Sequence, residues 1–153
     1  MNFKEYLKKT EQNALEEMAV LDTIVKELQT KGSLSPIELR AAKASLHVLI
    51  ENSIGKSKHL LRHFECPVTP VSAHDSVRIM RDVGMIDDIE YQRLSKAIGF
   101  RNAMIHDYMN FKPEVLVQLL RSGEHRYIAQ FLIQPADYSA LILKRLKGYA
   151  PIS

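Results

Sequence analysis

Apolar residues recur every three or four positions along most of this chain, which is the spacing that puts them on one side of an α-helix. The first such segment runs from about residue 2 to residue 30 and ends before Gly32. Its apolar stripe consists of Leu7, Ala14, Met18, Leu21, Val25 and Leu28. No stretch of the sequence shows the strict alternation of a β-strand, so the pattern predicts an all-α fold.

A second long helix is predicted from Ser35 to about His63. Ser35 can cap it, Pro36 suits its first turn, and Glu38 stands where it can complete a capping box. Gly55 in the interior weakens a helix by about 1 kcal/mol relative to alanine, which suggests that another helix approaches closely there. The side expected to be buried consists of Leu39, Ala42, Leu46, Leu49, Ser53, Leu60 and Leu61.

Shorter helices are predicted in the second half of the chain. Ser72 can cap a helix that ends at Gly84, and the Asp-Asp-Ile-Glu run at 87–90 is a capping-box pattern that opens the next one. Pro113 restarts a helix after a turn near Asn110. Gly123 and Pro135 separate the short pieces that follow. The residues of the helix opened at 87–90 that are expected to face inward are Ile89, Leu94, Ala97 and Ile98.

Length and composition fit one globular domain. The chain has 153 residues, of which 46% are hydrophobic and 25% charged, so we expect a single helical domain over 1–153 with 133–153 as a C-terminal extension. The single cysteine, Cys66, cannot form an internal disulfide, and no apolar run could span a membrane or resembles a signal peptide. A cytoplasmic protein is therefore expected. The net charge of +3 permits nucleic-acid binding without requiring it.

The chemistry of the chain is concentrated in Arg101, Asn102, His106 and Tyr108. A guanidinium binds phosphate oxygens through a rigid fork, and an imidazole exchanges protons near neutral pH. On a helix that turns about 100° per residue, Tyr108 lies on nearly the same stripe as Arg101, whereas His106 lies about 140° away from Arg101. The two groups can meet at one phosphate if the helix loosens around 105–107, or if a second copy of the chain brings its own residues across a two-fold axis.

The Arg-x4-His-x-Tyr spacing, with a polar residue directly after the arginine, resembles the signature of the HEPN superfamily. The final tyrosine is similar to that of its HepT-like branch, the toxin half of the HEPN/MNT toxin–antitoxin pairs. The flanking helix around 46–50 and the run 76–86 agree with this resemblance, which covers roughly residues 1–132. It implies an antiparallel bundle of four to five main helices and a homodimer with the motif at the cleft between the two copies. It also implies an MNT nucleotidyltransferase antitoxin as partner, which attaches AMP to Tyr108.

The activity implied is cleavage of RNA without a metal or another cofactor. His106 would take the proton of the 2′-hydroxyl, a role worth about 10²- to 10⁴-fold. Arg101 would offset the charge that builds on the phosphoryl oxygens, and Asn102 would orient the substrate or His106. The plainer alternatives are an ion-paired arginine on a helix surface, a structural histidine, and a Tyr108 ring packed against a neighbouring helix.

A basic patch is predicted near the end of the second helix, where Lys56, His59 and His63 share one face and Lys58 and Arg62 lie nearby. These side chains could follow an RNA backbone, with salt-sensitive affinity. The alternative is a solvated helix face whose charge complements the helix C-terminus. His59 and His63 also have the spacing of two metal ligands, but no glutamate follows His59 and no further ligand is near, so no metal site is expected.

Two classes of function therefore remain at the level of the sequence. One is a dimeric toxin that cuts RNA. The other is a non-catalytic helical module that binds a nucleotidyltransferase partner or a nucleotide. The presence of both Arg101 and His106 favours the enzyme, because a degenerate domain is expected to lose one of them.

Overall fold

The computed structural model describes residues 1–107 and 109–151, and its regular structure within these ranges is entirely α-helical. This confirms the predicted fold class. The helices are α1 (Phe3–Lys31), α2 (Pro36–His63), α3 (Ala73–Val83), α4 (Asp88–His106), α5 (Pro113–Arg121), α6 (Glu124–Ile133) and α7 (Ala140–Lys147).

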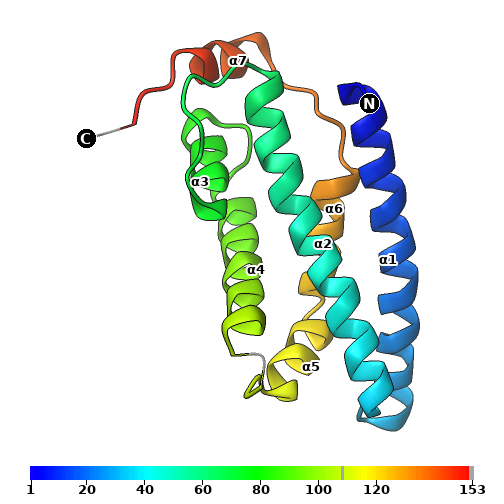
Figure 1. Ribbon diagram of the computed structural model, residues 1–153. Coiled ribbons are helices and arrows are strands. Elements are labelled where there is room, and N and C mark those ends of the chain that lie inside the picture. The colour runs from blue at the N-terminus through cyan, green and yellow to red at the C-terminus, as the bar shows by residue number, and fades with distance from the viewer. Residues whose placement is uncertain (108, 152–153) are drawn as a thin grey trace.

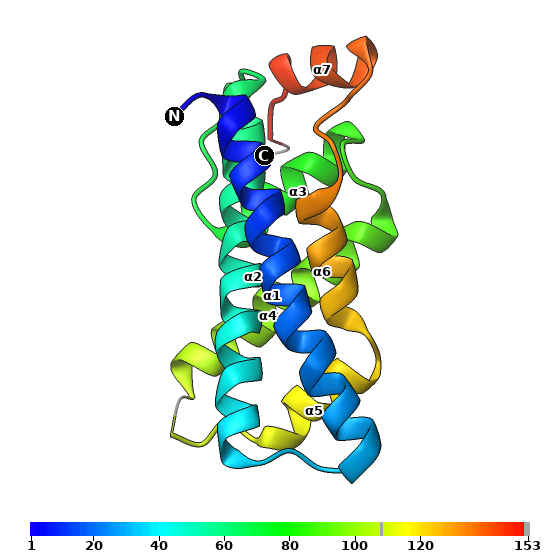
Figure 2. The same ribbon diagram turned by 90° about the vertical axis from the view of Figure 1, so that its right-hand side faces the viewer.

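The two longest helices, α1 and α2, form an antiparallel hairpin that runs the length of the molecule (Figure 1). Helix α6 packs against both of them, and α3 and α4 follow one another along the other side of α2. Helix α5 lies at one end of the bundle and α7 crosses the opposite end, as the rotated view in Figure 2 shows. The end of α4 that carries Arg101 and His106 is therefore the end nearest α5.

The helix boundaries follow the predicted capping residues. Gly32 ends α1 in the left-handed conformation, at φ 78°. Ser35, Ser72 and Asp87 each form a complete capping box, with the acidic residue three positions later returning a hydrogen bond to the cap. Each capping box involves only four consecutive residues, so Asp87 and Glu90 set the start of α4 without contacts from the rest of the chain. The start of α4 in turn decides which way Arg101 and His106 point from the helix.

The core contains most of the predicted apolar residues, with one clear exception. Leu94, Ala97 and Ile98 of α4 are buried as predicted, but Ile89 is 60% exposed. The prediction for Ile89 was wrong because the first turn of α4 borders a surface groove shared with Tyr127 of α6 instead of the core. The close approach expected at Gly55 is found, since a Cβ atom there would lie 3.3 Å from the Oη of Tyr6 on α1.

One buried side chain of the core is polar and unbonded. His125 of α6 is 1% exposed, and neither of its ring nitrogens takes part in a hydrogen bond with the described residues. Burial, and to a smaller extent the charge of Arg126, lowers the pKa of His125, while Asp22 acts in the opposite direction. Folding therefore disfavours the charged form of His125, because that form loses water and gains no hydrogen-bond partner among the described residues.

The segment after α6 crosses the end of the bundle and packs on α3. Leu146 of α7 is fully buried, and the hydroxyl of Tyr149 donates to Oδ2 of Asp82 over 3.1 Å. Lys147 lies 3.5 Å from a carboxylate oxygen of Glu65. The expected C-terminal extension is thus attached to the bundle by the buried Leu146, by partly buried apolar side chains such as Tyr138 and Ile142, and by polar contacts at its rim. None of the helices within the described ranges is long and apolar enough to cross a membrane.

Candidate functional site

Arg101 lies on the face of α4 that borders α2, where its side chain is held from two sides. Its Nε is 2.9 Å from Oε1 of Glu51 on α2, in an ion pair whose geometry does not make a hydrogen bond from the buried Nε–H group. Its Nη1 donates a hydrogen bond to Oδ1 of the neighbouring Asn102 over 2.9 Å. The Nη2 group donates no hydrogen bond within the described part of the chain. The guanidinium is therefore held by the charge of Glu51 beside Nε and by the hydrogen bond from Nη1 to Asn102, while its outer nitrogens retain N–H groups for an oxyanion.

Asn102 serves Arg101 in this structure. Its side-chain oxygen accepts the hydrogen bond from Nη1 of Arg101. The sequence predicted that Asn102 orients a substrate or His106, whereas in the structure its amide orients the guanidinium. The geometry leaves the NH2 group of Asn102 as a remaining donor at the site.

His106 occupies the last turn of α4 and is exposed. The backbone N–H of Asp107 still donates to the carbonyl of Ala103 over 3.0 Å, which is the regular helical pattern. The helix thus does not loosen before His106, and the first of the two arrangements inferred from the helical wheel is not the one observed. Arg101 and His106 of one chain remain on different sides of α4. Tyr108, the predicted AMP acceptor, lies outside the described residues.

Two further polar residues belong to the surroundings of Arg101, and the sequence analysis did not identify them. Glu51 pairs with Arg101, and the Nε2 of His47, one turn earlier on α2, lies 3.9 Å from the same Oε1 atom. In the sequence, His47 and Glu51 stand out only as two polar residues four positions apart among apolar neighbours. This spacing places them on one face of α2, but it does not show that the face is turned toward α4.

Lys56 was wrongly predicted to belong to an exposed basic patch. It is 1% exposed, and its Nζ donates to the carbonyls of Phe131 and Gln134 over 2.7 and 2.8 Å. These carbonyls close the C-terminal end of α6, where a positive charge is favourable. Burial lowers the pKa of Lys56 to about 8, although the charge of Glu11 acts against this. Lys56 is a structural clamp and has no access to an RNA backbone.

The other residues of the predicted basic patch differ in how far they are exposed. The rings of His59 and His63 stack on Tyr6 and Phe3 of α1, with centroids 3.8 and 3.7 Å apart. Burial, followed by the charge of Arg62, lowers the pKa of His59. Arg62 and His63 remain exposed, but His63 is twelve residues along α2 from Glu51, or roughly 18 Å at 1.5 Å per residue. The structure therefore does not bring this end of α2 to the motif of the same chain.

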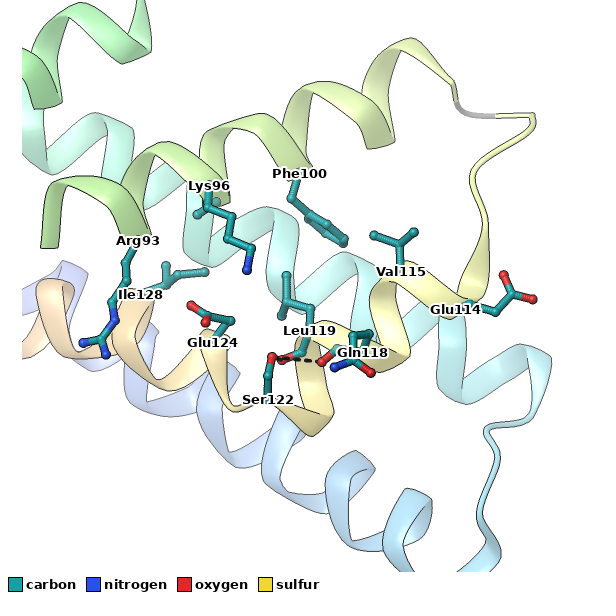
Figure 3. A pocket seen from close by; sticks show the side chains of 11 residues that line it. Arg93, Lys96, Phe100, Glu114, Val115, Gln118, Leu119, Ser122, Glu124 and Ile128 are labelled. Atoms are coloured by element: carbon teal, nitrogen blue, oxygen red, sulfur yellow. Dashed lines mark hydrogen bonds between the residues drawn. The ribbon is translucent and has the colours of Figure 1, made fainter. Parts of the chain in front are cut away.

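A well-formed hollow on the surface lies elsewhere on α4. It has a volume of about 580 Å³ between α4, α5 and α6 and is lined by Lys96, Phe100 and Leu119, among others (Figure 3). Arg101, Asn102 and His106 do not line it. Lys96 of α4 and Glu124 of α6 lie on opposite sides of this hollow, and the apolar side chains of Phe100 and Leu119 also line it. No three histidine, cysteine, aspartate or glutamate side chains among the described residues are grouped so that they could hold a metal ion.

Comparison with known proteins agrees with this description. The sequence profile of the family Ribonuclease HepT-like matches residues 4–134, and the chain therefore belongs to the HepT-like ribonuclease family. The bundle has the HEPN-type helical fold. A solved structure described as "Crystal structure of the toxin-antitoxin with AMP-PNP" superposes with a TM-score of 0.71 at 16% identity, over 86% of this chain and 99% of the other. No curated protein matches the chain.

Proposed function

We propose that this protein is the toxin of a HEPN/MNT toxin–antitoxin system and a metal-independent endoribonuclease. The observation that carries the proposal is the state of Arg101, whose guanidinium is anchored on one side and keeps donors on the other, one turn before an exposed His106. Membership of a ribonuclease family and a fold shared with a toxin–antitoxin structure support the same function.

The active form is proposed to be a homodimer with a composite cleft. Arg101 and His106 of one chain diverge around a helix that stays regular, so they cannot both face one phosphate. Beside His106, the apolar side chains of Ile105 and Met109 are 48% and 88% exposed. Exposed apolar groups around a polar site are typical of a surface that a second subunit covers. Two copies related by a two-fold axis would then combine the arginine of one with the histidine of the other.

Cleavage at this cleft would use the 2′-hydroxyl of the RNA as the nucleophile. His106 accepts its proton, the 2′-oxygen forms a bond to phosphorus, and the bond to the 5′-oxygen breaks as that oxygen takes up a proton from water or from a second acid at the cleft. The products are a cyclic phosphate and a free 5′-hydroxyl. Arg101 stabilises the negative charge on the phosphoryl oxygens as the bonds exchange. Asn102 keeps the guanidinium oriented.

The activity is tested with purified protein and labelled single-stranded RNA. We expect cleavage that continues in the presence of a chelator and leaves DNA of the same sequence intact, because DNA lacks the 2′-hydroxyl. In cells, induction of the wild type is expected to arrest growth, and induction of His106→Ala is not. A folded wild-type protein that cuts no RNA and does not affect growth would contradict the proposal.

The proposed antitoxin is an MNT nucleotidyltransferase that transfers AMP to Tyr108. An added AMP phosphate on nearly the same helical stripe as Arg101 would occupy the place of the RNA phosphate and fill the cleft. Intact-mass measurement after coexpression with the nucleotidyltransferase is expected to show one or more AMP-sized increments on the wild type. Their persistence in Tyr108→Phe, or their absence from the wild type, would contradict this part of the proposal.

The second candidate function is a helical module that binds the nucleotidyltransferase or a nucleotide without catalysis. The exposed apolar residues near the motif would suit a protein partner as well as a second copy. If neither the wild type nor His106→Ala affects growth, and the protein forms a stable complex with the nucleotidyltransferase, this second function is favoured.

The RNA contacts proposed for the first function do not extend to the basic end of α2, because Lys56 is buried and His59 is stacked on Tyr6.

A further inference from the structure

We propose that α2 completes the catalytic cleft: Glu51 is the positioning residue of Arg101, and His47 is a second proton-transfer group. This inference rests on the proposed ribonuclease function and names two residues outside the Arg-x4-His-x-Tyr motif. Its basis is one carboxylate oxygen, Oε1 of Glu51, that lies 2.9 Å from Nε of Arg101 and 3.9 Å from Nε2 of His47.

Glu51 determines which side of the guanidinium is free. An arginine side chain has many rotamers, and holding it costs conformational entropy. The pair with Glu51 uses the Nε side, and the bond to Asn102 uses one hydrogen of Nη1. The remaining N–H groups are on the outer edge of the guanidinium, the edge that can bind two oxygens of a phosphate. Glu51 thus directs Arg101 outward while keeping its own carboxylate on the opposite edge.

Stability gives little reason for this pair. The side chains of Arg101 and Glu51 are 22% and 42% exposed, and ion pairs that water can reach typically contribute little to the free energy of folding. Removing the carboxylate is therefore expected to leave the fold intact. A misdirected guanidinium, in contrast, costs catalysis, because displacement of a charged group by about 1 Å can lower a rate by about 10²-fold.

His47 supplies what the reaction otherwise lacks. Cleavage of the phosphodiester needs two proton transfers: the 2′-hydroxyl loses a proton, and the 5′-oxygen gains one as its bond to phosphorus breaks. One imidazole cannot accept the first proton and donate the second in the same step. His47 is half exposed, with a side-chain exposure of 45%, and it lies beside the carboxylate that anchors Arg101. We assign His106 to the 2′-proton and His47 to the proton delivered to the 5′-oxygen.

The assignment is tested first by kinetics. Glu51→Ala is expected to lower kcat by about 10- to 100-fold, with Glu51→Gln intermediate because its side-chain oxygen can still face Nε. His47→Gln is expected to lower kcat by about 10²-fold and to remove one limb of the pH–rate profile. Glu16→Gln and His74→Gln are matched controls, because both side chains are exposed and form no hydrogen bond or ion pair with the described residues. Wild-type rates and profiles in Glu51→Ala and His47→Gln would overturn the inference.

A second measurement does not depend on turnover. Side-chain NMR signals of Arg101, His47, His106 and His74 are followed while an RNA oligonucleotide methylated at its 2′-oxygens, which cannot be cleaved, is added to the wild type. The signals of Arg101, His47 and His106 are expected to shift together, and that of His74 is not. Shifts of Arg101 and His106 with an unmoved His47 would overturn the role of His47 alone. If none of the three moves, the proposed function fails together with the inference.

Discussion

Coexpression of Arg101→Ala and His106→Ala subunits is expected to restore about a quarter of wild-type cleavage, although each variant alone is inactive. Removal of the arginine should cost about 10²- to 10³-fold in kcat, the usual loss when a group that stabilises transition-state charge is removed. Removal of the histidine should cost about 10²- to 10⁴-fold. In a mixed dimer one subunit keeps Arg101 and the other keeps His106, so one complete pair forms across the two-fold axis.

The quarter follows from the geometry. Random pairing puts about half of the subunits into mixed dimers, and each mixed dimer has one complete pair where the wild type has two. Cleavage is measured on the unfractionated mixture, and mixed dimers purified through different tags on the two variants are expected to have about half of the wild-type activity. The matched control pairs Arg101→Ala with the double variant, which offers no arginine and must stay inactive. Isolated mixed dimers without activity would show that Arg101 and His106 act within one subunit.

Lys56→Met is expected to lower the free energy of unfolding by about 2–4 kcal/mol at pH 7. Methionine keeps the length and volume of the lysine stem, but it leaves the carbonyls of Phe131 and Gln134 without their donor in a buried place. The end of α6 would then be uncapped. Urea unfolding of both proteins measures the difference, and Lys58→Met, on the same helix but only half buried, is the control.

The same pair of proteins gives a prediction for pH. The pKa of Lys56 falls from 10.5 to about 8 on folding, so between these values the unfolded chain binds more protons than the folded one. Stability from this group therefore rises with pH over that window. The advantage of wild type over Lys56→Met is expected to be larger at pH 10 than at pH 7. An advantage that is constant or falls with pH would show that Lys56 is not buried in solution.

The fold could be predicted from the sequence where its signals are local. Ser35, Ser72 and Asp87 each act with an acidic residue three positions later, so these helix starts are encoded within four residues and were confirmed. The burial of individual side chains is different. Lys56 looked exposed because its neighbours are basic and polar, and only the packing of α6, more than sixty residues later, buries it. The apolar face of α4 was predicted correctly for Leu94, Ala97 and Ile98. Ile89 lies in the first turn of α4, which the core does not cover.

The candidate site shows the same division. The motif on α4 is contiguous in sequence and could be recognised from its spacing. Glu51 and Arg101 are fifty residues apart, and their contact depends on how α2 and α4 pack. A pattern within one helix holds no information about the helix that it will face. The anchor of the arginine and the nearby His47 therefore required the structure.

The uninterrupted final turn of α4 has a consequence for the protein level at which the proposed ribonuclease activity begins. If a working centre needs two chains, a newly made subunit is harmless, and at low abundance activity rises with the square of expression instead of in proportion to it. Low-level synthesis of the protein then produces almost no activity, whereas strong expression produces a disproportionately large activity. Under the proposed function, an antitoxin has its best opportunity to bind before two chains have met.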